Sequence, residues 1–194
     1  MKLNEEILER FRAGFEQARA AGDPEPTAMS LATVDEAGRP SVRVVLMKDF
    51  DADGFVFYTN TESRKGRQLA ENDAAALTFW WRETEQQVLI EGRAIPVSAE
   101  EADAYFASRP RGSRIGAWAS QQSRELESRQ ALLDRVRDLE AEYEGREIPR
   151  PPHWSGYRVE PGRVEFWYGR EFRLHERIAF TAGDDGWERK LLYP

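Results

Sequence analysis

The segment AMSLATVDEAGRPSVRVVLMKDFDADGFVFYTN (residues 28–60) decides the fold. It contains three runs rich in Val, Phe and Tyr, at residues 28–34, 41–47 and 55–60, which are separated by DEAGRP and DADG. Runs of this composition are typical of β-strands, and short breaks that contain Gly, Pro and Asp are typical of tight turns. The segment therefore predicts an antiparallel meander.

Helix-like and strand-like segments flank this meander. Leu3, Ile7, Phe11 and Phe15 recur every four residues, which predicts an N-terminal helix within residues 1–22. Serines precede two of the other expected helices as N-caps. The three other helices are expected at residues 63–72, 99–108 and about 124–144, with Ser63 and Ser98 as the two N-caps. Further strands are expected at residues 74–81, 85–97, 157–161, 163–169, 173–182 and 187–194.

These segments define the expected fold class. About eight short strands joined mainly by tight turns, with four helices, predict a mainly β protein with helices (α+β), whose antiparallel sheet closes into a barrel. Long βαβ crossovers and the glycine-rich phosphate motifs are absent from the sequence, which excludes a Rossmann fold and a P-loop. We expect residues 1–194 to form a single domain, with residues 154–194 as its C-terminal strands.

Composition excludes several classes of function. The chain has 28 Lys and Arg against 35 Asp and Glu, a net charge of -7 that argues against a general nucleic-acid binder. It has no Cys and two His, so thiolate sites and poly-histidine metal sites are excluded and no metal is expected. No apolar run is long enough to span a membrane, and the acidic N-terminus has no signal-peptide segment, so a cytoplasmic protein is expected.

Basic residues cluster near the ends of predicted elements. Arg64 and Lys65 follow Ser63 at a helix start, where free backbone N–H groups and the helix dipole favour a phosphate. Arg43 and Lys48 flank the most apolar strand. Strict strand alternation places these two on opposite faces, so they are expected to serve different ligands or different ends of one site.

The motif RLHER (residues 173–177) predicts a ligand-facing row of side chains. On a strand, Arg173, His175 and Arg177 share one face because they are spaced by two residues. Three such groups repel one another unless an anionic or electron-rich ligand lies over them. We therefore expect this face to contact a ligand.

Five stretches together resemble the pyridoxamine 5'-phosphate oxidase family. They are AMSLATVDEAGRPSVRVVLMK, GFVFYTNTESRKGRQL, AYFASRPRGSRIGAWASQQS, VEFWYGREFRLHER and the terminal LLYP, in the family's order from Thr27 to Pro194. The resemblance implies a homodimeric FMN-binding split β-barrel, with FMN at the subunit interface. It further implies oxidation of pyridoxamine or pyridoxine 5'-phosphate to pyridoxal 5'-phosphate, with O2 as acceptor and H2O2 as product.

The resemblance also assigns roles to residues. Arg173 and His175 are expected to lie over the substrate ring, to orient it for hydride transfer to the flavin and to steer the proton. The family's FMN contacts correspond to Arg43, Val44, Val45, Leu46, Met47, Lys48, Tyr58, Thr59, Arg64, Lys65, Gln87, Gln122, Ser123, Trp167 and Arg177. Its substrate contacts correspond to Lys48, Tyr105, Arg109, Ser113, Arg173, Leu174 and His175.

Two other functions stay open at this point. A flavin oxidase on the same scaffold could act on another aromatic compound, such as a phenazine precursor, and would share the FMN residues. A split barrel could also hold FMN or pyridoxal phosphate without turnover. The substrate-phosphate set of Lys48, Tyr105, Arg109 and Ser113 favours the phosphorylated vitamin.

Overall fold

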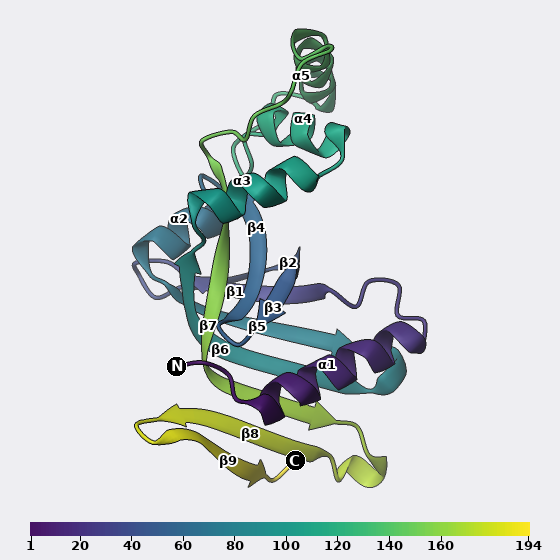
Figure 1. Ribbon diagram of the computed structural model, residues 1–194, viewed down its shortest axis with the longest axis vertical. Helices are drawn as coiled ribbons and strands as arrows, with labels where there is room; N and C mark the ends of the chain where they lie inside the picture. Colours follow the sequence, from purple (N-terminus) through teal and green to yellow (C-terminus); the bar gives the residue numbers. More distant parts are fainter.

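The computed structural model describes residues 1–194 and contains one curled antiparallel sheet of nine strands. The strand order is β2-β1-β5-β6-β7-β4-β3, and β8 pairs with β7 and β9 (Figure 1). The bounds of the strands are β1 Ala28–Val34, β2 Pro40–Leu46, β3 Asp49–Asp51, β4 Gly54–Asn60, β5 Ala74–Trp81, β6 Gln86–Pro96, β7 Trp154–Tyr168, β8 Glu176–Gly183 and β9 Gly186–Leu192.

The predicted meander is confirmed, with one additional strand. The first strand has the predicted bounds, 28–34, and pairs with β2 as expected. A short strand, β3, which the sequence did not predict, separates β2 from β4 and pairs with β4. Because Lys48 N donates to Val56 O at 2.8 Å, the chain after β2 is drawn against β4, and the sheet curls toward a barrel.

The expectation of two strands at residues 157–161 and 163–169 was wrong. These residues form one strand, β7, which is 15 residues long. Glu91 and Gly92 of β6 pair with Arg163 and Pro161 of β7, so Gly162 is the extra residue of a β-bulge in β7 and pairing continues past the proline. A Cβ at Gly92 would lie 2.1 Å from Glu160 O, so this close approach requires glycine.

The N-terminal helix α1 (Glu5–Ala20) closes one side of the sheet. It begins after Asn4, whose side chain accepts from Ile7 N, and it is shorter than the expected span of residues 1–22. The Phe11 ring contacts Phe50 and Phe55, with centroid distances of 4.7 and 4.8 Å. The apolar stripe of α1 thus belongs to the main core beneath the sheet.

Four further α-helices follow: α2 (Arg64–Glu71), α3 (Ala99–Ser108), α4 (Arg111–Ala119) and α5 (Arg129–Glu142). The expected long helix at about 124–144 was wrong at its start, because Ser128 caps α5 and the preceding residues form a loop. Helix α4 was not predicted, since its two glycines weaken the helical signal. Two short 3-10 turns, η1 (Arg82–Thr84) and η2 (Glu171–Arg173), complete the elements.

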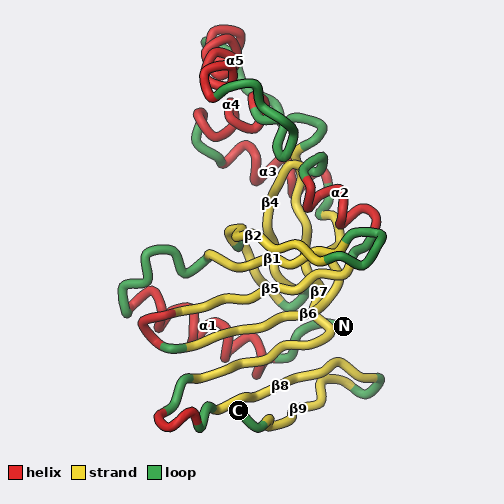
Figure 2. Tube along the Cα trace, turned by 180° about the vertical axis from the view of Figure 1, so that it is seen from behind, coloured by secondary structure: helices red, strands yellow, loops and turns green.

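Helices α3, α4 and α5 project from one end of the sheet, and strands β8 and β9 lie at the opposite end (Figures 1 and 2). The long strand β7 connects these ends: its first half pairs with β4 and its second half with β8. None of the helices is both long and apolar enough to cross a membrane.

Candidate active site

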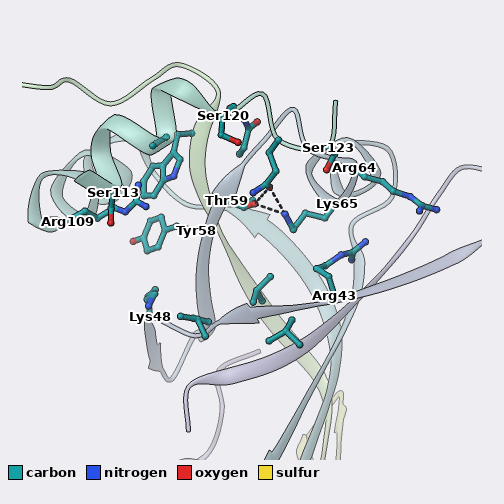
Figure 3. A pocket seen from close by; sticks show the side chains of 18 of the residues that line it. Arg43, Lys48, Tyr58, Thr59, Arg64, Lys65, Arg109, Ser113, Ser120 and Ser123 are labelled. Carbon is teal, nitrogen blue, oxygen red and sulfur yellow. Dashed lines mark hydrogen bonds between the residues drawn. The ribbon is translucent and has the colours of Figure 1, made fainter. Parts of the chain in front are cut away.

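A cavity of about 810 Å³ lies between the edge strand β2, the end of β4, the start of helix α2, and helix α4 with the loop that follows it (Figure 3). Because β2 has a paired neighbour on one side only, its free edge is available to line the cavity. The predicted site residues in its lining are Arg43, Val44, Val45, Leu46, Lys48, Tyr58, Thr59, Arg64, Lys65, Arg109, Ser113, Gln122 and Ser123.

Arg43 is held at one end of this cavity by neutral oxygens. Its Nη1 donates to Thr33 Oγ1 at 2.7 Å and to Leu31 O at 3.1 Å, and its Nη2 donates to Ser41 Oγ at 2.6 Å. Gln68 of α2 accepts from Thr33 and Ser41 through the same amide oxygen. The guanidinium is therefore fixed in position and its charge is not neutralised.

Lys65 is anchored in the same way. It is only 9% exposed, and its Nζ donates to Gln122 Oε1 at 2.7 Å and to Thr59 Oγ1 at 2.9 Å. Ser63 caps α2 by accepting from Gly66 N and also lies 3.3 Å from the ammonium. Lys65 reaches the cavity because it lies in the first turn of α2, which faces the cavity.

Burial and mutual repulsion shift the titration of these cations. Burial, and then the charge of Arg43, lowers the pKa of Lys65 from 10.5 to about 8. Burial, and then the charge of Arg64, lowers the pKa of Arg43. Arg43, Arg64 and Lys65 form no ion pair in the chain, so this end of the cavity is built for an anion.

A second group of polar side chains forms the other end. The Arg109 guanidinium lies 4.9 Å from the centroid of Trp154, and its Nη1 is buried without a hydrogen-bond partner. Burial lowers the pKa of Arg109. Tyr105 does not line the cavity, but its ring stacks on Tyr58 at 4.0 Å and supports the wall. Ser113 lies beside Arg109 (Figure 3).

Arg43 and Lys48 both line the cavity, at its two ends (Figure 3). The argument from strand alternation does not reach Lys48, because β2 ends at Leu46. Of the two outcomes that the spacing allowed, the structure shows two ends of one cavity. Met47 is the exception in this stretch, since its side chain is buried in the main core and does not line the cavity.

The remaining predicted residues lie elsewhere, on the face of the sheet turned away from the core. Gln87, Trp167 and Arg177 occupy opposing positions of β6, β7 and β8. The His175 ring lies 4.5 Å from that of Trp167. We call Gln87, Trp167, His175 and Arg177 the outer-face cluster. None of them, nor Arg173, nor Leu174, lines the cavity.

The expectation that RLHER lies on a strand was wrong. Arg173 ends the 3-10 turn η2, and β8 begins only at Glu176. Phe172 and Arg173 have positive φ angles of 56° and 61°, a strained backbone that interrupts the pleat. Strand alternation therefore does not place the side chains of Arg173, His175 and Arg177 on one face.

Strand β7 separates the two groups within one chain. Trp154 lines the cavity at the first residue of β7, whereas Trp167 lies near its end. A 15-residue strand has a path of about 50 Å at roughly 3.3 Å per residue. One chain thus presents a cavity at one end and the outer-face cluster toward the other.

Sequence reasoning missed several residues of the site. Asn60, Ser120 and Trp154 line the cavity, and Gln68 supports Arg43 from behind. Neutral polar side chains carry no charge signal, so composition and spacing do not single them out. Gln68 had one available signal, because it lies one helical turn after Arg64 and shares its face.

The comparisons with known proteins agree on one family. The profile described as "Pyridoxamine 5'-phosphate oxidase" matches residues 15–143, and that described as "Pyridoxine 5'-phosphate oxidase C-terminal dimerisation region" matches residues 154–194. A pyridoxine/pyridoxamine 5'-phosphate oxidase of Myxococcus xanthus is 54% identical over 96% of this chain and 91% of its own length. That of Paraburkholderia phytofirmans is 56% identical over 95% and 87%.

Solved structures show the same fold. PhzG from Burkholderia lata 383, in complex with tetrahydrophenazine-1-carboxylic acid, is 38% identical with a TM-score of 0.89, over 97% of this chain and 91% of that one. A pyridoxamine 5'-phosphate oxidase-related, FMN-binding protein of Nostoc punctiforme is 17% identical with a TM-score of 0.76, over 96% of each chain. With both family profiles matched, this chain belongs to the pyridoxamine 5'-phosphate oxidase family.

Proposed function

We propose that this protein is an FMN-dependent oxidase that converts pyridoxamine or pyridoxine 5'-phosphate to pyridoxal 5'-phosphate. O2 is the final acceptor and is reduced to H2O2, and the amine substrate also consumes one water, which supplies the aldehyde oxygen, and releases ammonia. The observation that carries the proposal is one cavity with an unneutralised cationic group at each end, a geometry that suits two phosphorylated ligands side by side.

The cationic end formed by β2 and α2 fits the FMN phosphate. Arg43, Arg64 and Lys65 converge on the cavity and have no carboxylate partner. Charge-assisted hydrogen bonds to a phosphate dianion are shorter and stronger than the neutral ones these side chains now make. FMN, when bound, supplies the two-electron acceptor.

The opposite end fits the substrate phosphate. Arg109 has a buried, unpartnered Nη1, and Lys48 and Ser113 line the same end. A phosphate there satisfies the orphaned N–H and offsets the cost of burying the guanidinium. These side chains orient the substrate, and positioning of this kind is the main contribution that we assign to the protein.

The partner subunit supplies the rest of the site in this proposal. The outer face of the sheet exposes Trp80 on β5 by 49%, with its ring 6.1 Å from that of Trp167 in the outer-face cluster, and it exposes Val42 and Val44 on the edge strand β2 by 69% and 65%. Such a face is typical of a surface that another chain covers. A homodimer brings the outer-face cluster and Arg173 of one chain to the cavity of the other. Arg173 and His175 then orient the substrate ring and hold the proton that moves.

The state of His175 suits that role. Its Nδ1 accepts from Arg170 N at 3.1 Å, so the neutral ring keeps its proton on Nε2. Trp167 packs against the ring and limits its rotation. The imidazole is thus presented with a donor on its outer edge, where it can contact a substrate.

The experiment is an absorption spectrum of the purified protein, followed by addition of pyridoxamine 5'-phosphate without oxygen. The proposal predicts a flavin spectrum that bleaches on addition and recovers, with H2O2 release, when air is admitted. A protein that takes up no FMN contradicts it. A flavin that does not bleach with either phosphorylated vitamin supports a binding module.

A phenazine precursor is the alternative substrate, because PhzG from Burkholderia lata shares 38% identity. The ligand of that structure is a carboxylic acid, which carries one negative charge where a phosphate carries up to two, so the cationic end with Arg109 and Lys48 favours the phosphate. Oxidation of a phosphate-free aromatic faster than of pyridoxamine 5'-phosphate reverses the assignment.

A further inference from the structure

Glu165 is the only carboxylate that the structure buries. It is 2% exposed and lies on β7, opposite Leu89 and Ala179. Its neighbours along the strand, Val164 and Phe166, point into the main core, so Glu165 points to the outer face. A buried charge is costly unless it is paired and hydrogen-bonded.

Both oxygens of Glu165 are engaged by arginines. Oε1 accepts from Arg177 Nε at 2.7 Å, and Oε2 accepts from Arg163 Nη2. Burial raises the pKa of Glu165, but the hydrogen bonds from Arg177 and Arg163 outweigh it and the pKa is lowered. The carboxylate therefore remains charged.

This contact fixes the orientation of Arg177. Its Nε is bound to Glu165, and its Nη1 donates to Tyr193 O at 3.0 Å. Nη2 has no partner in the chain, and the side chain is 31% exposed. Two of the three guanidinium nitrogens thus have hydrogen-bond partners, and Nη2 is available to a molecule or chain that covers the outer face.

We propose that Glu165 is a positioning residue: it holds Arg177 by its Nε edge so that the free Nη2 edge contacts the FMN ring in the site completed by the partner subunit. This inference rests on the proposed function. No other side chain of the protein forms a hydrogen bond with Arg177, since its remaining partner is the backbone carbonyl of Tyr193.

Stability alone is a weak reason for this arrangement. Replacing a buried ion pair by apolar residues of similar volume is often neutral or stabilising. The same outer face already contains apolar residues, such as Leu89 and Ala179 next to Glu165. A carboxylate between two arginines is explained when one of the arginines must keep a set direction.

The group is also balanced in charge. Arg163 donates from Nη1 to Glu91 at 3.0 Å, so Glu91, Arg163, Glu165 and Arg177 form a chain of two carboxylates and two guanidiniums. Arg177 therefore supplies a directed N–H, whereas Arg43, Arg64 and Lys65 supply net charge.

The test shortens the side chain of residue 165 by one methylene and keeps its negative charge. Glu165→Asp is expected to weaken FMN binding about tenfold and to shift the flavin absorption band, because the shorter side chain cannot reach both arginines. Glu91→Asp is the matched control: it removes the same methylene from the carboxylate that binds Arg163 but not Arg177. It should leave the FMN Kd and the spectrum unchanged.

The decisive readout is coupling to Arg177. In an Arg177→Met background, Glu165→Asp should cause no further change in FMN Kd or spectrum. Equal effects with and without Arg177, or a loss of melting temperature with unchanged flavin affinity, overturn the proposal. Wild-type protein that binds no FMN overturns the proposed function instead.

A second variant guards against misfolding of Glu165→Asp. Arg177→Lys keeps the charge, but one ammonium cannot hold Glu165 with one edge and contact the flavin with another. It should weaken FMN binding by a similar factor, and an unchanged Kd contradicts the positioning role.

Discussion

The cavity and the outer-face cluster both contain cationic side chains, but these side chains have different hydrogen-bond partners in the two regions. In the cavity, Arg43 and Lys65 are hydrogen-bonded to hydroxyls, amides and carbonyls. In the cluster, Arg177 is paired with a buried carboxylate. Both arrangements fix the position of a cation, but only the first leaves its charge unneutralised.

This difference teaches what each region is built to bind. Cations whose partners are all neutral repel one another, and an arriving dianion relieves that repulsion. A paired arginine offers little net attraction and mainly offers direction. We therefore assign phosphate binding to the cavity and ring orientation to the cluster.

The largest expected effect is a loss of FMN affinity when Lys65 is substituted. Lys65→Met should weaken FMN binding about 100-fold, because it removes a charge-assisted bond and part of the local cation density. Riboflavin, which has no phosphate, should bind as in the wild type. Flavin fluorescence titration measures both constants. Arg67→Met, a charge change on the same helix outside the cavity, is the control.

Arg109 should affect the substrate and leave the cofactor unchanged. Arg109→Met is expected to raise KM for pyridoxamine 5'-phosphate about tenfold, because the substrate phosphate loses its buried donor. The FMN Kd should stay at the wild-type value. Steady-state O2 uptake measures KM. An equal loss of FMN affinity contradicts the division of the cavity into two ends.

A smaller effect is expected from pH. Lys65 has its pKa lowered to about 8 in the folded protein, so above pH 8 it is progressively neutral and FMN affinity should fall. Bound phosphate raises this pKa again, so FMN binding should take up protons near pH 9. Calorimetry in two buffers of different ionisation enthalpy measures the uptake. Lys65→Arg should abolish it, and uptake retained in that variant contradicts the assignment.

The smallest effect is expected at the exposed pair next to the cluster. Arg170 Nη2 lies 3.0 Å from Glu176 Oε2, and both side chains are about half exposed. Arg170→Gln should change the free energy of unfolding by less than about 1 kcal/mol, since exposed pairs are weak. Urea denaturation measures it. A loss of several kcal/mol contradicts the contrast between this pair and the buried Glu165 pair.

The sequence predicted the parts of the fold that depend on local pattern. Strand β1 and helix α3 have the predicted bounds, because alternation and a serine N-cap are local signals. The single strand β7 could not be predicted, because Pro161-Gly162 looks like a break in the sequence, whereas the structure accommodates Gly162 as a bulge against β6. The turn at Phe172 and Arg173 could not be predicted either, because it requires strained φ angles.

The charged residues of the site could be predicted from the sequence, but the residues that hold them in position could not. Arg43, Arg64 and Lys65 were singled out by position and charge, and they line one cavity. Gln68 and Glu165 were missed, because their importance lies in contacts between strands and helices far apart in sequence. The family resemblance alone supplied Gln87 and Trp167, whereas Arg177 was also singled out by the RLHER motif, and none of the three lines the cavity that contains Arg43.

The most direct test of the central claim, that one active site is assembled from two regions of two chains, is a heterodimer of Lys65→Met and Arg173→Ala subunits. At an FMN concentration that saturates the wild type but lies well below the weakened Kd of Lys65→Met, each variant alone should have little activity. Purified through two different affinity tags, the mixed dimer should recover about half of wild-type activity, because one of its two sites contains neither substitution. A heterodimer of Lys65→Met with Arg43→Met, both in the cavity, should stay inactive. A Lys65→Met/Arg173→Ala heterodimer as inactive as its parents contradicts the account.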